Sequence, residues 1–196
     1  VKEKRFTWLL NTLIINKNKN WHKADLGDLA LIQKGEQLNV TDMIDSGSYY
    51  ALNGGIEPSG YTNNWNVPEN TVTISEGGNS CGFVRFNTQK FWCGGHCYAL
   101  LNISKNINVK YLYFFLKAHE KHLMSLRVGS GLPNIQKKDV QNLNVFYPFL
   151  DQQETIASIL NTSQQEIELL KKQLEAYRKQ KRGLMQKLLT GQWRVK

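Results

Sequence analysis

The expected fold is set by residues 151–190, which read DQQETIASILNTSQQEIELLKKQLEAYRKQKRGLMQKLLT. One set of side chains in this stretch recurs with gaps that alternate between four and three residues: Ile156, Leu160, Ser163, Ile167, Leu170, Leu174, Tyr177, Lys181, Leu184 and Leu188. Such an unbroken 3.5-residue period is typical of a coiled-coil seam. Because a helix cannot bury this stripe against itself, the pattern predicts a partner helix. We name the members other than Ser163 and Lys181 the seam.

The ends of this helix carry start and stop signals. Asp151 is the expected N-cap, Glu154 stands where a capping box places its acidic partner, and Gly191 follows the last helical residue. At about 1.5 Å per residue, we expect a helix roughly 60 Å long.

The alternative is a helix that packs along its own domain. Apolar residues also lie off the seam, at Ile159, Leu169 and Met185, so contact with more than one neighbouring helix is compatible with the sequence. Because the seam is long and the preceding domain is small, we favour a separate partner helix.

The preceding sequence predicts a small α/β domain over residues 21–150. Short strand-like runs alternate there with turns rich in Gly and Asn, at residues 29–33, 49–52, 71–75, 82–86, 91–92, 96–101 and 143–147. Residues 71–75 are expected to form a half-buried strand, and residues 109–126 a single amphipathic helix. The predicted fold class is α/β: a small domain with a mixed sheet and loops, followed by a long C-terminal coiled-coil helix in residues 151–196.

The first 20 residues are interpreted as a leader or linker. An apolar run at residues 6–15 follows basic residues, as in a signal peptide, but a polar Asn/Lys run at residues 16–20 replaces the small-residue cleavage site. No stretch approaches the roughly 18 uninterrupted apolar residues of a membrane span. We therefore expect no membrane contact and a location in the cytoplasm.

The three cysteines, Cys81, Cys93 and Cys97, do not resemble a secreted disulfide framework, because their number is odd. Cys93, His96 and Cys97 could be considered metal ligands, but the cluster lacks the second ligand pair of a structural zinc site. We predict no metal site and expect Cys97 to be a buried strand residue.

The formal net charge is +9, from 25 Lys and Arg against 16 Asp and Glu. Residues 151–196 contribute +4 and residues 1–150 the other +5. This balance fits a polyanionic partner, and nucleic acid is the leading candidate for a protein without a membrane element.

Common catalytic motifs are absent from the sequence. The glycine-rich run at residues 76–82 fits neither G-x-G-x-x-G nor a P-loop, and neither G-x-S-x-G nor H-E-x-x-H occurs. We predict no catalytic residue; the rival from this class is a hydrolase or transferase that acts through His96 or Cys97.

Side chains suited to base recognition lie instead in or near the predicted turns. Amides and cations contact base edges and phosphates, and aromatic residues are interleaved with them here. Turn geometry explains any one of these residues equally well, but their clustering and the positive charge favour DNA. The DNA-binding candidates are Lys34, Gln37, Asn53, Tyr61, Asn63, Asn64, Trp65, Asn79, Arg85, Arg127, Ser130, Asn134, Gln136 and Lys137.

Four stretches in order carry a family resemblance: WHKADLGD at residues 21–28, GSGLPNI at 129–135, VFYP at 145–148 running into DQQETIASIL at 151–160, and KQKRGLMQKLLTG at 179–191. Together they resemble one half of a specificity (S) subunit of a type I restriction–modification system, over residues 21–193. The chain departs from the family at Gln152-Gln153, where Glu-Gln is usual, and residues 34–95 match only in outline.

The resemblance implies that residues 21–150 are a target recognition domain and residues 151–196 a spacer and dimerisation helix without catalytic activity. Family members carry two such domains and two antiparallel helices, and each domain reads one part of a split DNA site. Methyltransferase (M) subunits dock beside the helices, and restriction (R) subunits join them. S-adenosylmethionine, Mg²⁺ and ATP are used by these partner subunits, so no cofactor is expected in this chain.

The partner of the seam is expected to be a second copy of the chain or the other half of a longer S subunit. A two-fold dimer predicts a palindromic split site. Two alternatives remain: a stand-alone nucleic-acid-binding protein with a coiled-coil dimerisation helix, and an assembly module that binds no DNA.

Overall fold

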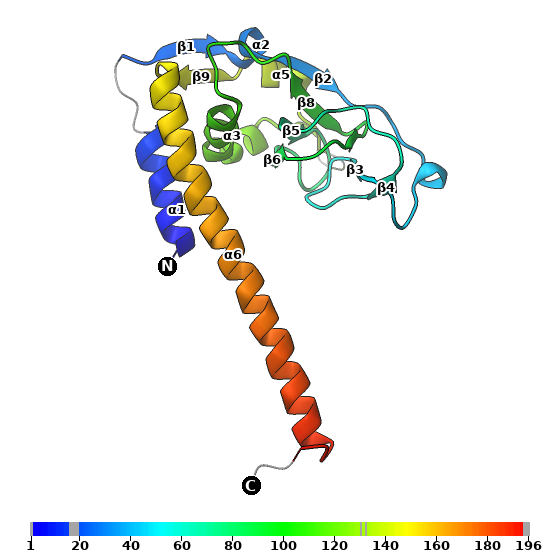
Figure 1. Ribbon diagram of the computed structural model, residues 1–196. Coiled ribbons are helices and arrows are strands. Elements are labelled where there is room, and N and C mark those ends of the chain that lie inside the picture. The colour runs from blue at the N-terminus through cyan, green and yellow to red at the C-terminus, as the bar shows by residue number, and fades with distance from the viewer. Residues whose placement is uncertain (1, 16–19, 130, 132, 194–196) are drawn as a thin grey trace.

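A long helix leaves one end of a small α/β domain (Figure 1). The computed structural model describes residues 2–15, 20–129, 131 and 133–193. The long helix, α6 (Leu150–Leu189), contains 40 residues and is therefore about 60 Å long. This helix and the α/β domain confirm the predicted fold class. Among the helices of the described residues, none has the length and apolarity that crossing a membrane requires.

A four-stranded antiparallel sheet forms the centre of the domain. Its strands lie in the order β2 (Leu31–Lys34), β8 (Cys97–Leu101), β5 (Thr71–Ser75), β6 (Val84–Asn87). All residues of β5 are buried, so the prediction of a half-buried strand is wrong. One face places Val72 and Ile74 in the main core, and on the other the Thr73 hydroxyl accepts a hydrogen bond from the buried Asn87 amide. A strand paired on both edges and covered on both faces has no side left for solvent.

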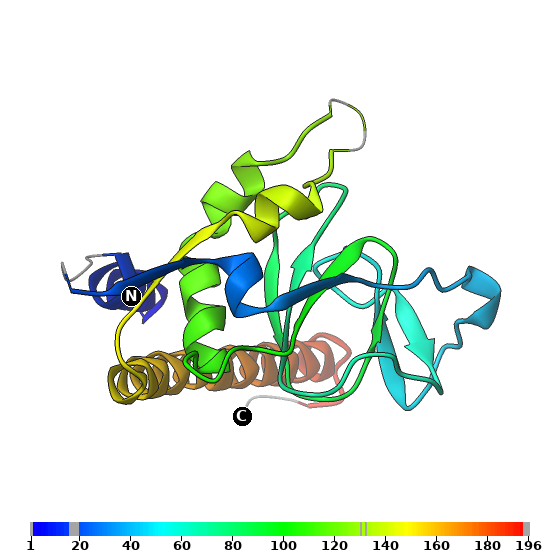
Figure 2. The same cartoon turned by 90° about the horizontal axis from the view of Figure 1, so that it is seen from above.

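Two smaller sheets flank the central one. β1 (His22–Asp25) pairs with β9 (Asn144–Tyr147), and β3 (Tyr49–Leu52) lies between β4 (Gly60–Thr62) and β7 (Trp92–Cys93). The β3–β7 pair is parallel and the other strand pairs are antiparallel, so the three-stranded sheet is mixed, as predicted. Seen from above, the three-stranded sheet lies at the end of the domain opposite the N-terminal helix (Figure 2).

Residues 109–126 form two helices rather than the single helix predicted. α3 (Val109–Ala118) is mostly buried, and α4 (Glu120–Ser125) begins after His119. The His119 backbone leaves the helical region with φ −99° and ψ 12°, and its ring Nδ1 lies 2.8 Å from the Phe115 carbonyl. The Glu120 carboxylate then accepts the Val84 N–H of β6 at 2.9 Å. Tertiary contacts therefore break the apolar period.

The other short helices are η2 (Val40–Asp42), α2 (Leu26–Leu29) and α5 (Lys137–Gln141).

The N-terminal segment is not a linker over its described part. Residues 2–15 form helix α1 (Lys2–Leu10) and a π-helical turn, η1 (Asn11–Ile15). Leu10 and Ile14 are buried in the main core, and Lys2 and Glu3 of α1 form ion pairs with α6. Part of the apolar run thus packs on the domain, whereas Trp8 and Ile15 of the same run are exposed. The Asn/Lys run of the proposed linker falls mostly on residues 16–19, outside the described residues.

The start of α6 differs from the capping prediction. Phe149 occupies the N-cap position with no side-chain cap, and Asp151 lies in the first turn, where a negative charge favours the helix dipole. The fully buried side chain of Gln153 anchors this end: its Oε1 accepts Asn108 N–H at 2.9 Å, and its Nε2 donates to Asn106 O at 2.9 Å and Pro148 O at 2.8 Å. Gln153 therefore joins α6 to the loop before α3.

Candidate nucleic-acid interface

The predicted DNA-binding residues fall in three places on the domain. The largest group surrounds two turns, residues 76–82 between β5 and β6 and residues 94–96 between β7 and β8. We call this surface the turn face. Its members among the predicted residues are Lys34, Gln37, Asn53, Asn79, Arg127, Asn134 and Gln136.

Backbone hydrogen bonds hold the segments of the turn face together, although they are distant in the sequence. Gly78 N–H donates to Pro133 O at 3.0 Å, and Ile135 N–H donates to Glu76 O at 2.9 Å. Glu76 N–H in turn donates to His96 O at 2.9 Å. The clustering expected of these turn residues is therefore present for this group.

Glu76 is the buried centre of the turn face and is not among the predicted DNA-binding residues. Its Oε1 accepts hydrogen bonds from Lys34 Nζ at 2.6 Å and from Tyr98 OH at 3.1 Å. Its Oε2 is buried without a hydrogen-bond partner, and His96 Nδ1 lies 3.8 Å away. Burial, reinforced by the Glu76 charge, raises the pKa of Tyr98, so this hydroxyl stays protonated and donates. The available signal was an acidic residue placed between an apolar strand and Gly77-Gly78.

Close backbone approaches shape this surface. Gly54 has φ +84°, and a Cβ there would lie 2.7 Å from His96 O. A Cβ on Gly94 would lie 2.7 Å from Asn53 Oδ1, which is buried without a hydrogen-bond partner. Asn53 is therefore packed against the β7–β8 turn and is less accessible than the sequence suggested.

The C-terminal side of the turn face carries exposed polar groups. Asn134 Oδ1 accepts from Gln136 Nε2 at 3.1 Å, and Lys137 begins α5 next to them. Burial raises the pKa of the Cys81 thiol, and the charge of nearby Arg127 partly offsets this rise. Ser130 lies outside the described residues.

Arg85 belongs to a second surface. Its Nη1 donates to Ile56 O at 2.8 Å, and its guanidinium carbon lies 5.7 Å from the centre of the Tyr50 ring. It also lines a groove of about 540 Å³ between β6, α3 and α6, together with Lys110 and Lys117. Arg85 is thus separated from the turn-face residues that the sequence grouped with it.

The end of β4 and the following loop form a third surface. Tyr61 and Trp65 are 42% and 44% exposed, and Lys90 Nζ lies 4.3 Å from the centre of the Trp65 ring. Asn63 Oδ1 accepts Ser48 N–H at 3.4 Å, and Asn64 N–H donates to the Thr62 hydroxyl at 3.2 Å. Both asparagines are exposed and partly engaged in the local turn. An aromatic ring beside a cation suits contact with a nucleic acid.

The seam of α6 is divided between two environments. Leu160 is fully buried in the domain core, and Ile156 is half-buried against it. Ile167 is also half-buried, and it lines a pocket with Phe6 of α1. These three residues pack along the chain's own domain, which was the less favoured alternative.

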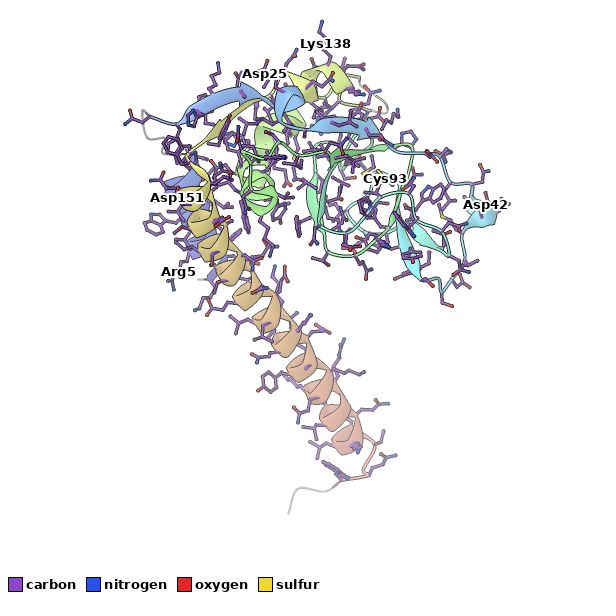
Figure 3. The ribbon with its side chains drawn as sticks, turned by 45° about the horizontal axis from the view of Figure 1, so that its top comes forward. Arg5, Asp25, Asp42, Cys93, Lys138 and Asp151 are labelled. Atoms are coloured by element: carbon purple, nitrogen blue, oxygen red, sulfur yellow. The ribbon has the colours of Figure 1, made fainter. Side chains whose placement is uncertain are left out.

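The remaining seam residues are exposed. Leu170, Leu174, Tyr177, Leu184 and Leu188 lie between 40% and 67% exposed on the part of α6 beyond the domain. The side chains of this part project into solvent around the helix (Figure 3). Leu169, Met185 and Leu189 add to the exposed apolar surface. We call residues 169–189 the outer arm; it retains an exposed apolar stripe, and Lys171 near its start pairs with Glu3 of α1 at 2.7 Å.

The cysteines are arranged for packing rather than for chemistry. Cys81, Cys93 and Cys97 are buried and free, and Figure 3 places Cys93 among the strands. The Cys97 interaction, followed by burial, raises the pKa of the Cys93 thiol, which disfavours the thiolate needed for nucleophilic attack or metal binding. Among the described residues, no three His, Cys, Asp or Glu side chains gather where they could hold a metal ion.

Comparison with known proteins extends these observations. A family model described as "Type I restriction modification DNA specificity domain" matches residues 18–176. The chain is 36% identical over 180 residues to a type I specificity subunit of Mycoplasma pneumoniae, covering 91% of this chain and 48% of that protein. It is 32% identical over 169 residues to one from Mycoplasma genitalium, covering 85% and 44%. The chain thus spans about half the length of the curated relatives it matches.

Solved structures agree with these matches. The crystal structure of a type I restriction–modification S subunit from M. genitalium aligns with a TM-score of 0.79 at 30% identity, covering 90% of this chain and 47% of that one. An HsdS subunit from Thermoanaerobacter tengcongensis shares the fold, with a TM-score of 0.66 at 20% identity. The fold of the domain, its long helix and the matched residues together identify the family of this chain. This chain belongs to the type I restriction modification DNA specificity domain family.

Proposed function

We propose that this chain is the DNA-recognition part of a type I restriction–modification complex and reads one half of a bipartite site in double-stranded DNA. The observation that carries the proposal is the combination of a polar, cation-bearing turn face with an outer arm whose apolar stripe is exposed. The turn face provides hydrogen-bond donors for base edges and phosphates. The outer arm provides a spacer helix that needs another helix against its apolar stripe.

The proposed occupant of the outer arm is a second spacer helix, from another copy of this chain or from the other half of a longer subunit. Relatives about twice as long as this chain support the need for two halves. Helix α6 is about 60 Å long, and a DNA turn is about 34 Å, so an antiparallel pair holds two domains about one to two turns apart.

We further propose that M subunits dock beside the helices and that R subunits join them. In this scheme the chain contributes no catalysis, and S-adenosylmethionine, Mg²⁺ and ATP are used by the partner subunits in the cytoplasm. The buried cysteines support a non-catalytic role. A stand-alone nucleic-acid-binding protein with the same dimerisation helix is the second candidate, and the sequence relatives named as specificity subunits disfavour it.

The decisive experiment is genome-wide mapping of adenine methylation in cells that express this chain with its methyltransferase. A split motif is expected, and it is expected to be palindromic if two copies pair. Methylation without this chain at the same sites, or no dependence of the motif on it, contradicts the proposal. Analytical ultracentrifugation tests the pairing itself: a monomer at micromolar concentration contradicts self-association but not recognition by the other half of a longer subunit.

A further inference from the structure

A buried carboxylate lies beneath two exposed basic side chains on the turn face. Glu76 is 7% exposed, whereas the side chains of Lys34 and His96 are 51% and 61% exposed. Burying a carboxylate is costly unless its oxygens are paired. Oε1 has two donors, Lys34 and Tyr98, but Oε2 has none within hydrogen-bond distance. His96 Nδ1, at 3.8 Å, is placed to become that donor after a small movement.

We propose that His96, as an imidazolium positioned by Glu76, binds a backbone phosphate of DNA together with Lys34. This inference rests on the proposed function. When Nδ1–H faces the Glu76 carboxylate, the opposite ring nitrogen, Nε2, can donate its proton outward to a phosphate oxygen. The proton that charges the ring comes from solvent and is taken up on binding. Glu76 acts as a positioning residue and does not touch the DNA.

The surroundings of His96 favour a phosphate over a base edge. Lys34 and a protonated His96 would together place two positive charges beside the single Glu76 carboxylate, and the resulting net positive charge suits an anion. Gly77 lies beside the Nδ1 side of the ring, where a Cβ would be 3.8 Å from His96 Nδ1 and 3.7 Å from Pro133 O. The His96 side chain itself is 61% exposed, so its ring can be reached from solvent.

The charged and titratable groups around His96 predict the sign of the pH effect. The Glu76 carboxylate faces the ring from the turn after β5, and the Lys34 ammonium of opposite charge lies on β2 beside the same carboxylate. Tyr98 of β8 is neutral, because burial raises its pKa. A bound phosphate adds a second negative charge, so protonation of the ring and binding of DNA favour each other. The proposal therefore predicts lower affinity at about pH 8 than at about pH 6.

The test uses the full chain and a fluorescein-labelled, mixed-sequence duplex of roughly 30 base pairs, since phosphate contacts do not depend on sequence. Fluorescence anisotropy is measured over a salt series at about pH 6 and about pH 8. If the bound phosphate favours protonation of the ring by about tenfold, Kd rises up to about 10-fold between these pH values. The log–log salt slope is expected to be steeper at the lower pH by about 0.9, the value for one phosphate contact.

The variant His96→Gln keeps a polar side chain that cannot titrate. Its binding should lose the pH dependence and follow the wild-type salt slope of the higher pH. His122→Gln is the matched control, because His122 is an exposed histidine on α4, and it should keep the wild-type pH dependence. Glu76→Gln should move the pH dependence to lower pH, with folding checked by circular dichroism.

Two results overturn the inference while leaving DNA recognition intact: wild-type binding that is independent of pH, or a pH dependence that survives His96→Gln. If His96→Gln weakened binding only to duplexes that carry one particular base at one position, the inference would also be overturned, because that result would indicate a base contact. No binding of the full chain to duplex DNA at either pH would remove the proposed function, and this inference with it.

Discussion

Gln153 offers the sharpest test of how the spacer helix is joined to its domain. Its amide makes three hydrogen bonds in a fully buried site, and two of them are donations from Nε2 to the carbonyls of Asn106 and Pro148. Gln153→Glu keeps the volume and the acceptor for Asn108 N–H but replaces both donations with a carboxylate oxygen facing two carbonyls. Each buried polar group left without its partner costs about 1–3 kcal/mol. With two carbonyls left without a donor, the free energy of unfolding should therefore fall by about 2–6 kcal/mol at neutral pH.

The adjacent Gln152→Glu is the matched control. Gln152 is exposed in the same helical turn, so its substitution should change the free energy of unfolding by less than about 0.5 kcal/mol. Urea denaturation followed by circular dichroism measures both variants. The carboxyl that Gln153→Glu introduces is buried and faces acceptors, so its pKa in the folded chain is raised above the unfolded value of about 4.3. The part of the penalty that comes from ionisation is absent below the unfolded pKa, grows as pH rises, and is complete above the folded pKa. A smaller loss remains at low pH, because the protonated carboxyl has one O–H for two carbonyls. Equal stability of the two variants at neutral pH would refute the anchoring role.

Two further pairs of substitutions test the packing. Leu160→Ala should lower the free energy of unfolding by about 2–5 kcal/mol, since Leu160 is fully buried. Leu174→Ala should leave monomer stability nearly unchanged and weaken association in sedimentation experiments, because Leu174 is exposed. Equal losses of stability would contradict the division of the seam. Gly54→Ala should destabilise the domain by about 2 kcal/mol, because its φ is +84° and a Cβ would meet a carbonyl oxygen. Gly183→Ala is its control: nothing lies within 4 Å, and helix propensity predicts a gain of up to about 1 kcal/mol in thermal or urea unfolding.

The helix and the strands that could be predicted from the sequence follow from local periodicity. The seam repeat requires only that successive turns of one helix carry apolar side chains, and α6 follows it from Leu150 to Leu189. Strand β5 was predicted from its alternation of Val and Ile with Thr and Ser, and β8 from a short strand-like run after the Gly94-Gly95 turn. The family resemblance is confirmed by the match over residues 18–176.

The features that could not be predicted depend on contacts between segments that are distant in the sequence. The break at His119 depends on Glu120 reaching β6, and the packing of α1 depends on its contacts with α6 and α3. The separation of Arg85 from the turn face follows from its contacts with Ile56 and Tyr50, which are distant from it in the sequence. Glu76 was hidden for the same reason: its partners come from β2, β8 and the β7–β8 turn.

Residue type and spacing along the chain are enough to establish a long apolar-striped helix and a basic, turn-rich α/β domain, because both are local properties. Which part of that stripe is covered, and which polar residues share one surface, depends on tertiary contacts. Burial of Leu160 and the assembly of the turn face around Glu76 are contacts between distant segments. Their geometry is set by how the whole core packs, and no local pattern encodes it.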